Sequence, residues 1–255
     1  MKNLFFLVLL SFSLQSFAAS NPQSIVHLLT YLSQDYSGAV KDGKVVSEEE
    51  YHEQLELIDE IIKYADRENP FPLEIKKSIN YLKKLIEEKS EPIMVSKIAL
   101  DIKTQVINTF KIPTFPNSWP SPGNGEKIYL KNCASCHGDL GYGDGPESKG
   151  LNPMPRNFHD KESMEKISTF QAFNTVVLGI EGTSMVPVKD LSEAEAWDVA
   201  FYVISLRYQN SRKEQNNDFE LTEVSSKSDF ELKEKLTDFN DEAKNSRIAD
   251  RKSVV

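Results

Sequence analysis

The 255-residue sequence predicts an all-α protein, with an N-terminal helical bundle over residues 22–110 and a second helical domain over residues 123–208. Two observations carry this prediction. Apolar residues recur at intervals of three and four in both regions, which is the spacing of one face of an α-helix. Serines followed three positions later by Glu or Gln precede several of these stripes, as is typical of helix starts. Between the two regions, residues 111–122 hold four prolines, so we expect an extended, stiff linker there.

Residues 1–18 have the pattern of a secretory signal peptide. Lys2 supplies a positive charge, residues 4–14 form an almost unbroken apolar run, and small residues precede the expected cleavage point after Ala18. The run is too short to span a bilayer comfortably. We therefore expect cleavage and export to the periplasm, with no stable membrane insertion afterwards. An uncleaved N-terminal anchor is the alternative.

Four amphipathic helices with short connections are expected in residues 22–110, a pattern that indicates an up-and-down bundle. Ser47 begins a capping box at the second helix, and Pro92 suits the first position of the fourth. Asp42-Gly43 predicts the turn between the first two helices. The four apolar stripes are Ile25, Leu28, Leu29 and Leu32; Tyr51, Leu55, Ile58 and Ile62; Ile75, Ile79, Leu82 and Ile86; and Ile98, Ile102 and Val106.

The second domain is expected to hold three main helices. The first contains Gly125, the middle one begins after Ser168 and ends at Gly179, and the last begins with a capping box at Ser192. A glycine on the first helix would let the first and last helices cross closely, because it lacks a side chain.

Residues 209–255 form a polar tail. Ser228 begins one short helix there, and its few apolar residues are Phe230, Leu236 and Phe239. Because so few apolar side chains bury little surface, we expect this tail to be loosely ordered and only partly helical.

The most informative motif is Cys133-Ala134-Ser135-Cys136-His137, which holds the only two cysteines of the chain. C-x-x-C-H is the attachment signature of covalent haem. Two thiols one helical turn apart can add to the two vinyl groups of one porphyrin, and the histidine then binds the iron. A zinc ribbon would need a second ligand pair, a thioredoxin-like pair would need a preceding strand, and a disulfide would close a very small loop. We therefore expect one haem c on Cys133 and Cys136, with His137 as proximal ligand.

Met185 is the expected second axial ligand of the iron. It lies well after the C-x-x-C-H motif, so the chain has room to pass around a porphyrin. Gly182 would permit a close approach of the backbone, and Pro187 would stiffen it. A thioether favours reduced iron, so His/Met ligation would raise the reduction potential.

The alternatives to Met185 are other side chains or an open distal site. Met154 and Met164 follow His137 closely, and packing is their expected role. His159 would give bis-histidine ligation and a lower potential. An open distal site would imply ligand binding or peroxidase chemistry. His27 and His52 lie in the N-terminal bundle and are expected to be unrelated to the iron.

Two interactions are expected around the haem. A carbonyl from Pro146, Pro153 or Pro155 would hold Nδ1 of His137 and fix the ring. The guanidinium of Arg156 could bind a haem propionate bidentately, although a plain surface arginine is an equal alternative.

Residues 123–208 resemble class I c-type cytochromes. The resemblance implies haem c, electron transfer and the ligand pair His137 and Met185. The residues that carry it, besides C-x-x-C-H, are Gly125, Tyr129, Gly138, Gly143-Asp144-Gly145-Pro146, Pro153, Pro155, Asn157-Phe158, Gly179-Ile180, Gly182-Thr183, Met185, Leu191-Ser192, Glu195 and Trp197.

The first region resembles the extracytoplasmic N-terminal part of bacterial iron permeases of the fungal high-affinity type, some of which carry a fused cytochrome c domain. The matching stretch runs from Tyr31 to Gln54, and the permease helices and their Arg-Glu-x-x-Glu motif are absent. Carboxylates suit iron ions, so a speculative iron site would use four acidic residues. The alternative is that these residues bind no metal and are solvated at a turn and a helix start, where acids are favoured. These residues are Asp35, Asp42, Glu49 and Glu53.

The sequence thus predicts a periplasmic monohaem electron-transfer protein, not an enzyme. Its formal net charge of −9 excludes a basic nucleic-acid footprint. Its expected partners are a redox protein and a separately encoded iron permease, for which it would accept electrons during ferrous iron uptake. The alternative is an electron-transfer subunit of a respiratory dehydrogenase or oxidase, with a docking domain that binds no metal.

Overall fold

The computed structural model describes residues 21–208, 219–237 and 241–253, so the expected signal peptide lies outside the described residues. The prediction of an all-α fold is confirmed, since helices dominate the described chain and its strands are two residues long. Within the described ranges no helix is long and apolar enough to cross a bilayer.

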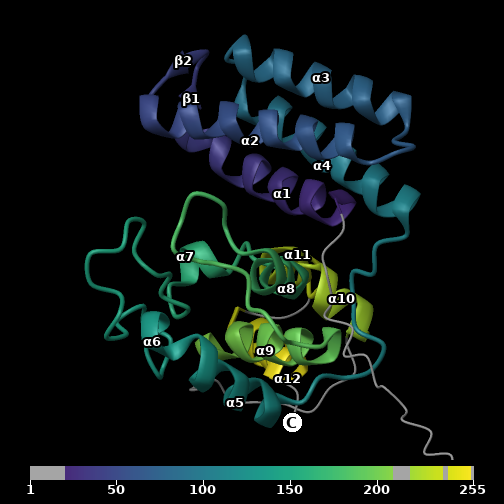
Figure 1. The fold of residues 1–255 in the computed structure, drawn as a ribbon. Coiled ribbons are helices and arrows are strands. Elements are labelled where there is room, and N and C mark those ends of the chain that lie inside the picture. The colour runs from purple at the N-terminus through teal and green to yellow at the C-terminus, as the bar shows by residue number, and fades with distance from the viewer. Residues whose placement is uncertain (1–20, 209–218, 238–240, 254–255) are drawn as a thin grey trace, which may run out of the picture.

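The N-terminal bundle consists of α1 (Asn21–Ala39), α2 (Glu48–Arg67), α3 (Leu73–Glu87) and α4 (Pro92–Phe110). These are the four helices that the apolar stripes predicted, and α4 begins at its proline as expected. α1 packs against both α2 and α4, and α3 packs against the outer side of that pair (Figure 1). The apolar stripes are buried between the helices, so hydrophobic burial holds the bundle together.

A short β-hairpin joins α1 to α2, where the sequence predicted only a turn. Its strands are β1 (Val40–Lys41) and β2 (Lys44–Val45), which pair antiparallel. The two residues between them, Asp42 and Gly43, both have positive φ, of 52° and 70°. This is the backbone that a tight two-residue hairpin turn requires, and Asp-Gly is a favoured pair for it.

The second unit starts after residues 111–121, which form no regular structure. The unit contains α5 (Pro122–Asn132), α6 (Ala134–His137), α7 (Lys161–Met164), α8 (Thr169–Leu178) and α9 (Glu193–Ser205), which runs into a short 3₁₀ turn, Leu206–Tyr208. Phe173 of α8 stacks on Trp197 of α9, with ring centroids 4.2 Å apart.

The crossing of α5 and α9 depends on Gly125, as predicted. A β-carbon at this position would lie 2.2 Å from the carbonyl oxygen of Asp198 and 2.8 Å from Cβ of Tyr202. No side chain fits there, because contacts below 3 Å are repulsive. The carboxylate of Asp198 then accepts hydrogen bonds from the amide of Ser121 at 2.6 Å and the side chain of Asn124 at 2.7 Å. These bonds hold the start of α5 on α9.

The expectation of a loosely ordered tail is wrong for the described part of residues 209–255. That part forms α10 (Leu221–Ser226), α11 (Asp229–Lys235) and α12 (Asp241–Ser253). α10 packs on α8, α12 packs on α9, and α11 packs on α12 (Figure 1). A few apolar side chains anchor it, with exposures of 0 to 1 %: Phe219, Val224, Leu232 and Ile248.

A buried group of charges completes this anchor. The carboxylate of Asp229 pairs with the guanidinium of Arg207 and, at 2.8 Å, with Nζ of Lys252, which has no exposed surface. The polar composition of the tail therefore misled the prediction, because part of its polar content is paired inside the fold instead of solvated.

The N-terminal bundle also docks on the second unit. α1 is the bundle helix that faces α8 (Figure 1), and it contacts α8 directly. The two units are thus joined by a packed helix pair as well as by residues 111–121.

Candidate functional site

A cavity of about 890 Å³ opens in the second unit, next to the face that meets α1. Its volume lies in the upper part of the range for cofactor pockets. Cys133, Cys136, His137 and Met185 all line it, although α6 and the chain after α8 are far apart in sequence. The rest of its wall is largely apolar, as a porphyrin face requires.

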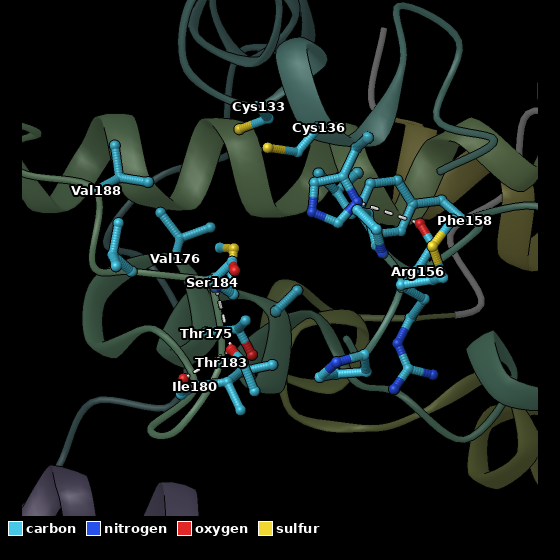
Figure 2. Close-up of a pocket in the computed structure, with 18 of the residues that line it drawn as sticks. Cys133, Cys136, Arg156, Phe158, Thr175, Val176, Ile180, Thr183, Ser184 and Val188 are labelled. Atoms are coloured by element: carbon cyan, nitrogen blue, oxygen red, sulfur yellow. Dashed lines mark hydrogen bonds between the residues drawn. The ribbon is translucent and has the colours of Figure 1, made fainter. Parts of the chain in front are cut away.

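The two cysteines lie one helical turn apart, with Cys133 immediately before α6 and Cys136 within it. Both are free thiols. Figure 2 shows them side by side on one wall of the cavity, with Thr183 and Ser184 across from them. Burial raises the pKa of Cys133 to about 12. That thiol therefore sits in an apolar environment, which suits the neutral sulfur of a thioether.

The imidazole of His137 is held on two sides. Its Nδ1 lies 3.2 Å from the backbone oxygen of Arg156, to which it donates in the Nδ1–H tautomer. Its ring stacks on Phe158, with centroids 4.6 Å apart. Burial lowers the pKa of His137, so the neutral ring is favoured. Nε2 is then left with a lone pair for a metal.

The expected proline carbonyls do not hold this ring, and the prediction of Pro146, Pro153 or Pro155 is wrong. Arg156, the residue after Pro155, supplies the oxygen. Periodicity and spacing cannot distinguish neighbouring carbonyls of an irregular loop, because each peptide plane can turn independently of the side-chain pattern.

The glycine-rich loop after the motif closes the end of α6. The amide of Gly143 donates to the carbonyl of His137 at 2.8 Å, and the amide of Gly145 donates to that of Cys136 at 3.1 Å. A β-carbon on Gly145 would lie 2.3 Å from the carbonyl oxygen of Ser135. The loop thus satisfies the last carbonyls of this short helix, and only glycine fits at the closest approach.

The chain that carries Met185 is fixed by its own backbone. The amide of Ile180 donates to the carbonyl of Met185 at 2.7 Å, and the amide of Met185 donates to the hydroxyl oxygen of Thr183 at 3.1 Å. No protein atom lies within 4 Å of a potential β-carbon on Gly182, so the expected approach of its backbone to a porphyrin stays a prediction. Within the protein, the close backbone approach occurs at Gly179, where a β-carbon would lie 2.5 Å from the carbonyl oxygen of Met185.

Both rival methionines also line the cavity, and they differ in exposure. Met164 is buried at 1 % exposure, and Met154 is 62 % exposed. His159 bonds through Nε2 to the carbonyl of Leu140 at 2.7 Å, stacks on Tyr142 and does not line the cavity.

Arg156 lines the cavity, as a propionate partner would. Sequence reasoning missed Tyr31 of α1, which also lines it. The charge of Arg156 reaches this helix, because it opposes the rise that burial causes in the pKa values of Tyr31 and Asp35. The N-terminal bundle therefore contributes part of the cavity wall.

The four carboxylates proposed as an iron site are not gathered. In the described chain no three His, Cys, Asp or Glu side chains are close enough together to hold a metal ion. Asp42 occupies the hairpin turn, and Glu49 lies in the first turn of α2, where acids favour the helix dipole. Desolvation by nearby protein atoms raises the pKa of Asp35 to about 6. The charge of Arg156 opposes this rise, and Glu50 and Glu53 add to it.

Comparison with known proteins assigns the second unit. Residues 123–207 match the family model of cytochrome c. They form a cytochrome c domain. The match covers roughly a third of the chain and leaves the N-terminal region unassigned. No curated protein and no solved structure matches the chain.

A cytochrome c domain implies covalent haem c and haem-based electron transfer, and the residues present fit that group. Two free thiols, one imidazole with an available Nε2 and the thioether of Met185 border the same apolar cavity, which Met154 and Met164 also line. This is the donor set of a thioether-linked haem with His/Met ligation.

His27, which we expected to be unrelated to the iron, lies at the boundary between α1 and this domain. It is 4 % exposed, and its Nε2 donates to the carbonyl of Gly179 at 2.9 Å. Its Nδ1 has no hydrogen-bond partner among the described residues. Burial lowers the pKa of His27 to about 4, so the ring is neutral at physiological pH.

The lowered pKa predicts a loss of stability in acid. Between pH 6.5 and pH 4 the unfolded chain protonates His27 and the folded chain does not, so stability falls as the pH falls through this window. We expect protonation of His27 in the unfolded chain to lower the free energy of unfolding by about 2 kcal/mol when the pH falls from 7 to 5. Urea denaturation at both pH values measures this loss, and subtracting the loss in His27→Gln isolates it. An equal loss in that variant would contradict the assignment.

Proposed function

We propose that this chain is an exported, periplasmic one-electron carrier and not an enzyme. The observation that supports this most strongly is the position of the two expected axial ligands. His137 and Met185 border one cavity from separate segments, and both lie on chain that is fixed by hydrogen bonds. A carrier needs this arrangement, whereas a peroxidase needs one open coordination position.

The protein residues keep the site unchanged during transfer. When bound, haem supplies an iron that gains and loses a single electron. Arg156 and Phe158 keep the ring of His137 in one orientation. The backbone hydrogen bond from Ile180 to Met185 fixes the segment that carries Met185. Ligands that stay in place in both oxidation states need little rearrangement, which favours rapid exchange with a redox partner protein.

The cavity opens where a partner could approach. Met154 and Val186 line it and are 62 % and 66 % exposed. These apolar side chains lie at the rim of the cavity. Electrons would pass between the haem at this rim and the partner, without a substrate entering the iron site.

The distal ligand is tested by replacing Met185 with alanine. The wild-type protein should be low-spin with a weak far-red band from methionine ligation, and Met185→Ala should lose that band completely while the haem stays attached. Optical spectra of the oxidised proteins measure this. Met154→Ala is the matched control, because it removes a methionine from the same cavity and should keep the band. A band that survives in Met185→Ala and vanishes in Met154→Ala would assign the ligand to Met154.

We further propose that the electrons come from ferrous iron oxidised at a separately encoded permease. The support is the resemblance of the stretch from Tyr31 to Gln54 to the N-terminal part of such permeases, and it does not depend on a metal site in the bundle. The alternative is a subunit of a respiratory dehydrogenase or oxidase. Affinity purification from cells grown with little iron should recover an iron permease, and recovery of a respiratory complex at unchanged expression would favour the alternative.

A further inference from the structure

α1 carries a polar stripe that faces the cytochrome c domain. Its residues are spaced at three and four, opposite the apolar face that packs inside the N-terminal bundle. Each one hydrogen-bonds to α8 or to the residue that follows it. The bonds join Gln23 Nε2 to Asn174 Oδ1 at 3.0 Å, His27 Nε2 to Gly179 O at 2.9 Å, the hydroxyls of Tyr31 and Thr175 at 3.0 Å, and Gln34 Nε2 to Gln171 Oε1 at 3.1 Å.

His27 is the member of this stripe that bonds to Gly179, the residue from which the chain leads to Met185. Its ring packs edge-on against Tyr31, with centroids 4.9 Å apart, so the ring is held in place. His27 donates its hydrogen bond to the carbonyl of Gly179, the C-cap residue of α8. A helix end that is buried needs such a partner for its last carbonyls.

A single peptide group connects His27 to Met185. The carbonyl of Gly179 accepts from His27 at 2.9 Å, and the amide of the next residue, Ile180, donates to the carbonyl of Met185 at 2.7 Å. The carbonyl and the amide belong to one planar unit, so holding one end orients the other. Hydrogen bonds on the two ends of one peptide also polarise each other in the same direction.

We propose that His27 is a positioning residue for the axial ligand Met185, and that α1 of the N-terminal bundle is thereby part of the distal support of the haem. This inference rests on the proposed function, in which Met185 binds the iron. His27 does not line the cavity that would hold the haem. It acts through the peptide between Gly179 and Ile180, which it holds in the orientation that the segment of Met185 requires.

The test measures how easily added imidazole displaces Met185 from ferric iron in the full-length protein. His27→Phe keeps a ring in the buried site and removes the donor, so the apparent affinity for imidazole should rise about fivefold, the ratio that one ordinary hydrogen bond sustains. His27→Gln retains an N–H donor and should stay near the wild type. If the phenylalanine variant does not accumulate, His27→Leu removes the donor with a smaller side chain.

The matched control is His52→Ala, which removes an exposed histidine of the same bundle that pairs with Glu56 at 3.2 Å. Its affinity for imidazole should equal that of the wild type. An unchanged affinity in His27→Phe, or an equal rise in His52→Ala, would overturn the inference and leave the function intact. A wild-type spectrum with attached haem and no far-red band would overturn the ligand assignment and the inference together.

Discussion

Replacing Asp229 with alanine is expected to lower the free energy of unfolding by about 3–5 kcal/mol. Its carboxylate is 3 % exposed and sits between Arg207 and Lys252. Removal would leave two buried cations without their counter-charge. Burial already lowers the pKa values of both cations, and the charge of Asp229 opposes that effect. Chemical denaturation followed by circular dichroism measures the loss.

The control for this variant is Asp66→Ala. Asp66 forms an ion pair with Lys76 at the same 2.8 Å separation, but its side chain is 66 % exposed. Because solvent screens an exposed pair, its loss should cost less than about 1 kcal/mol. Equal losses in the two variants would show that the buried group of charges does not anchor α11 and α12. Limited proteolysis should also cleave Asp229→Ala within the tail first.

Gly179→Ala is expected to affect both stability and the axial ligand. The residue has φ of 71° and ψ of −165°, a region that is almost restricted to glycine. Strain of this kind costs about 1–3 kcal/mol. The new β-carbon would also lie 2.5 Å from the carbonyl of Met185 and 2.8 Å from the ring of Pro187. The segment of Met185 must therefore move, and the far-red band should weaken or disappear.

Gly182→Ala separates backbone strain from this clash. Gly182 also has a positive φ, of 78°, but nothing lies within 4 Å of its potential β-carbon. We expect a loss of about 1–2 kcal/mol from the left-handed backbone, with the far-red band retained. Denaturation curves and optical spectra of both variants provide the measurement. Loss of the band in Gly182→Ala alone would place the critical approach at that glycine.

The helices were predictable because their signals are local. Pro92 begins α4, Ser168 caps α8, and Ser192 forms a complete capping box with Glu195 at the start of α9. The tail was not predictable in this way. Ser228 begins α11 as expected, yet the pairing that fixes this helix joins residues from three separate segments, and composition does not show it.

The candidate site divides along the same line. Covalent attachment of a porphyrin needs two thiols and a histidine at a fixed short spacing. The sequence itself therefore predicts that chemistry at Cys133, Cys136 and His137. Met185 could be selected from the remaining methionines by its distance along the chain and its flanking residues. Its role as an iron ligand stays a prediction, although the structure brings it to the same cavity as the motif.

The sequence by itself determined the all-α class, the helix boundaries marked by caps, and the cofactor chemistry, because each depends on residues within a few turns of one another. Only the tertiary structure decided that α1 docks on α8, that Tyr31 lines the cavity and that His27 bonds to Gly179. These contacts join residues 144 and 152 positions apart. Single polar pairs at such separations leave no periodic pattern in the sequence. They form only when two helix surfaces pack together, so only the tertiary structure identifies them.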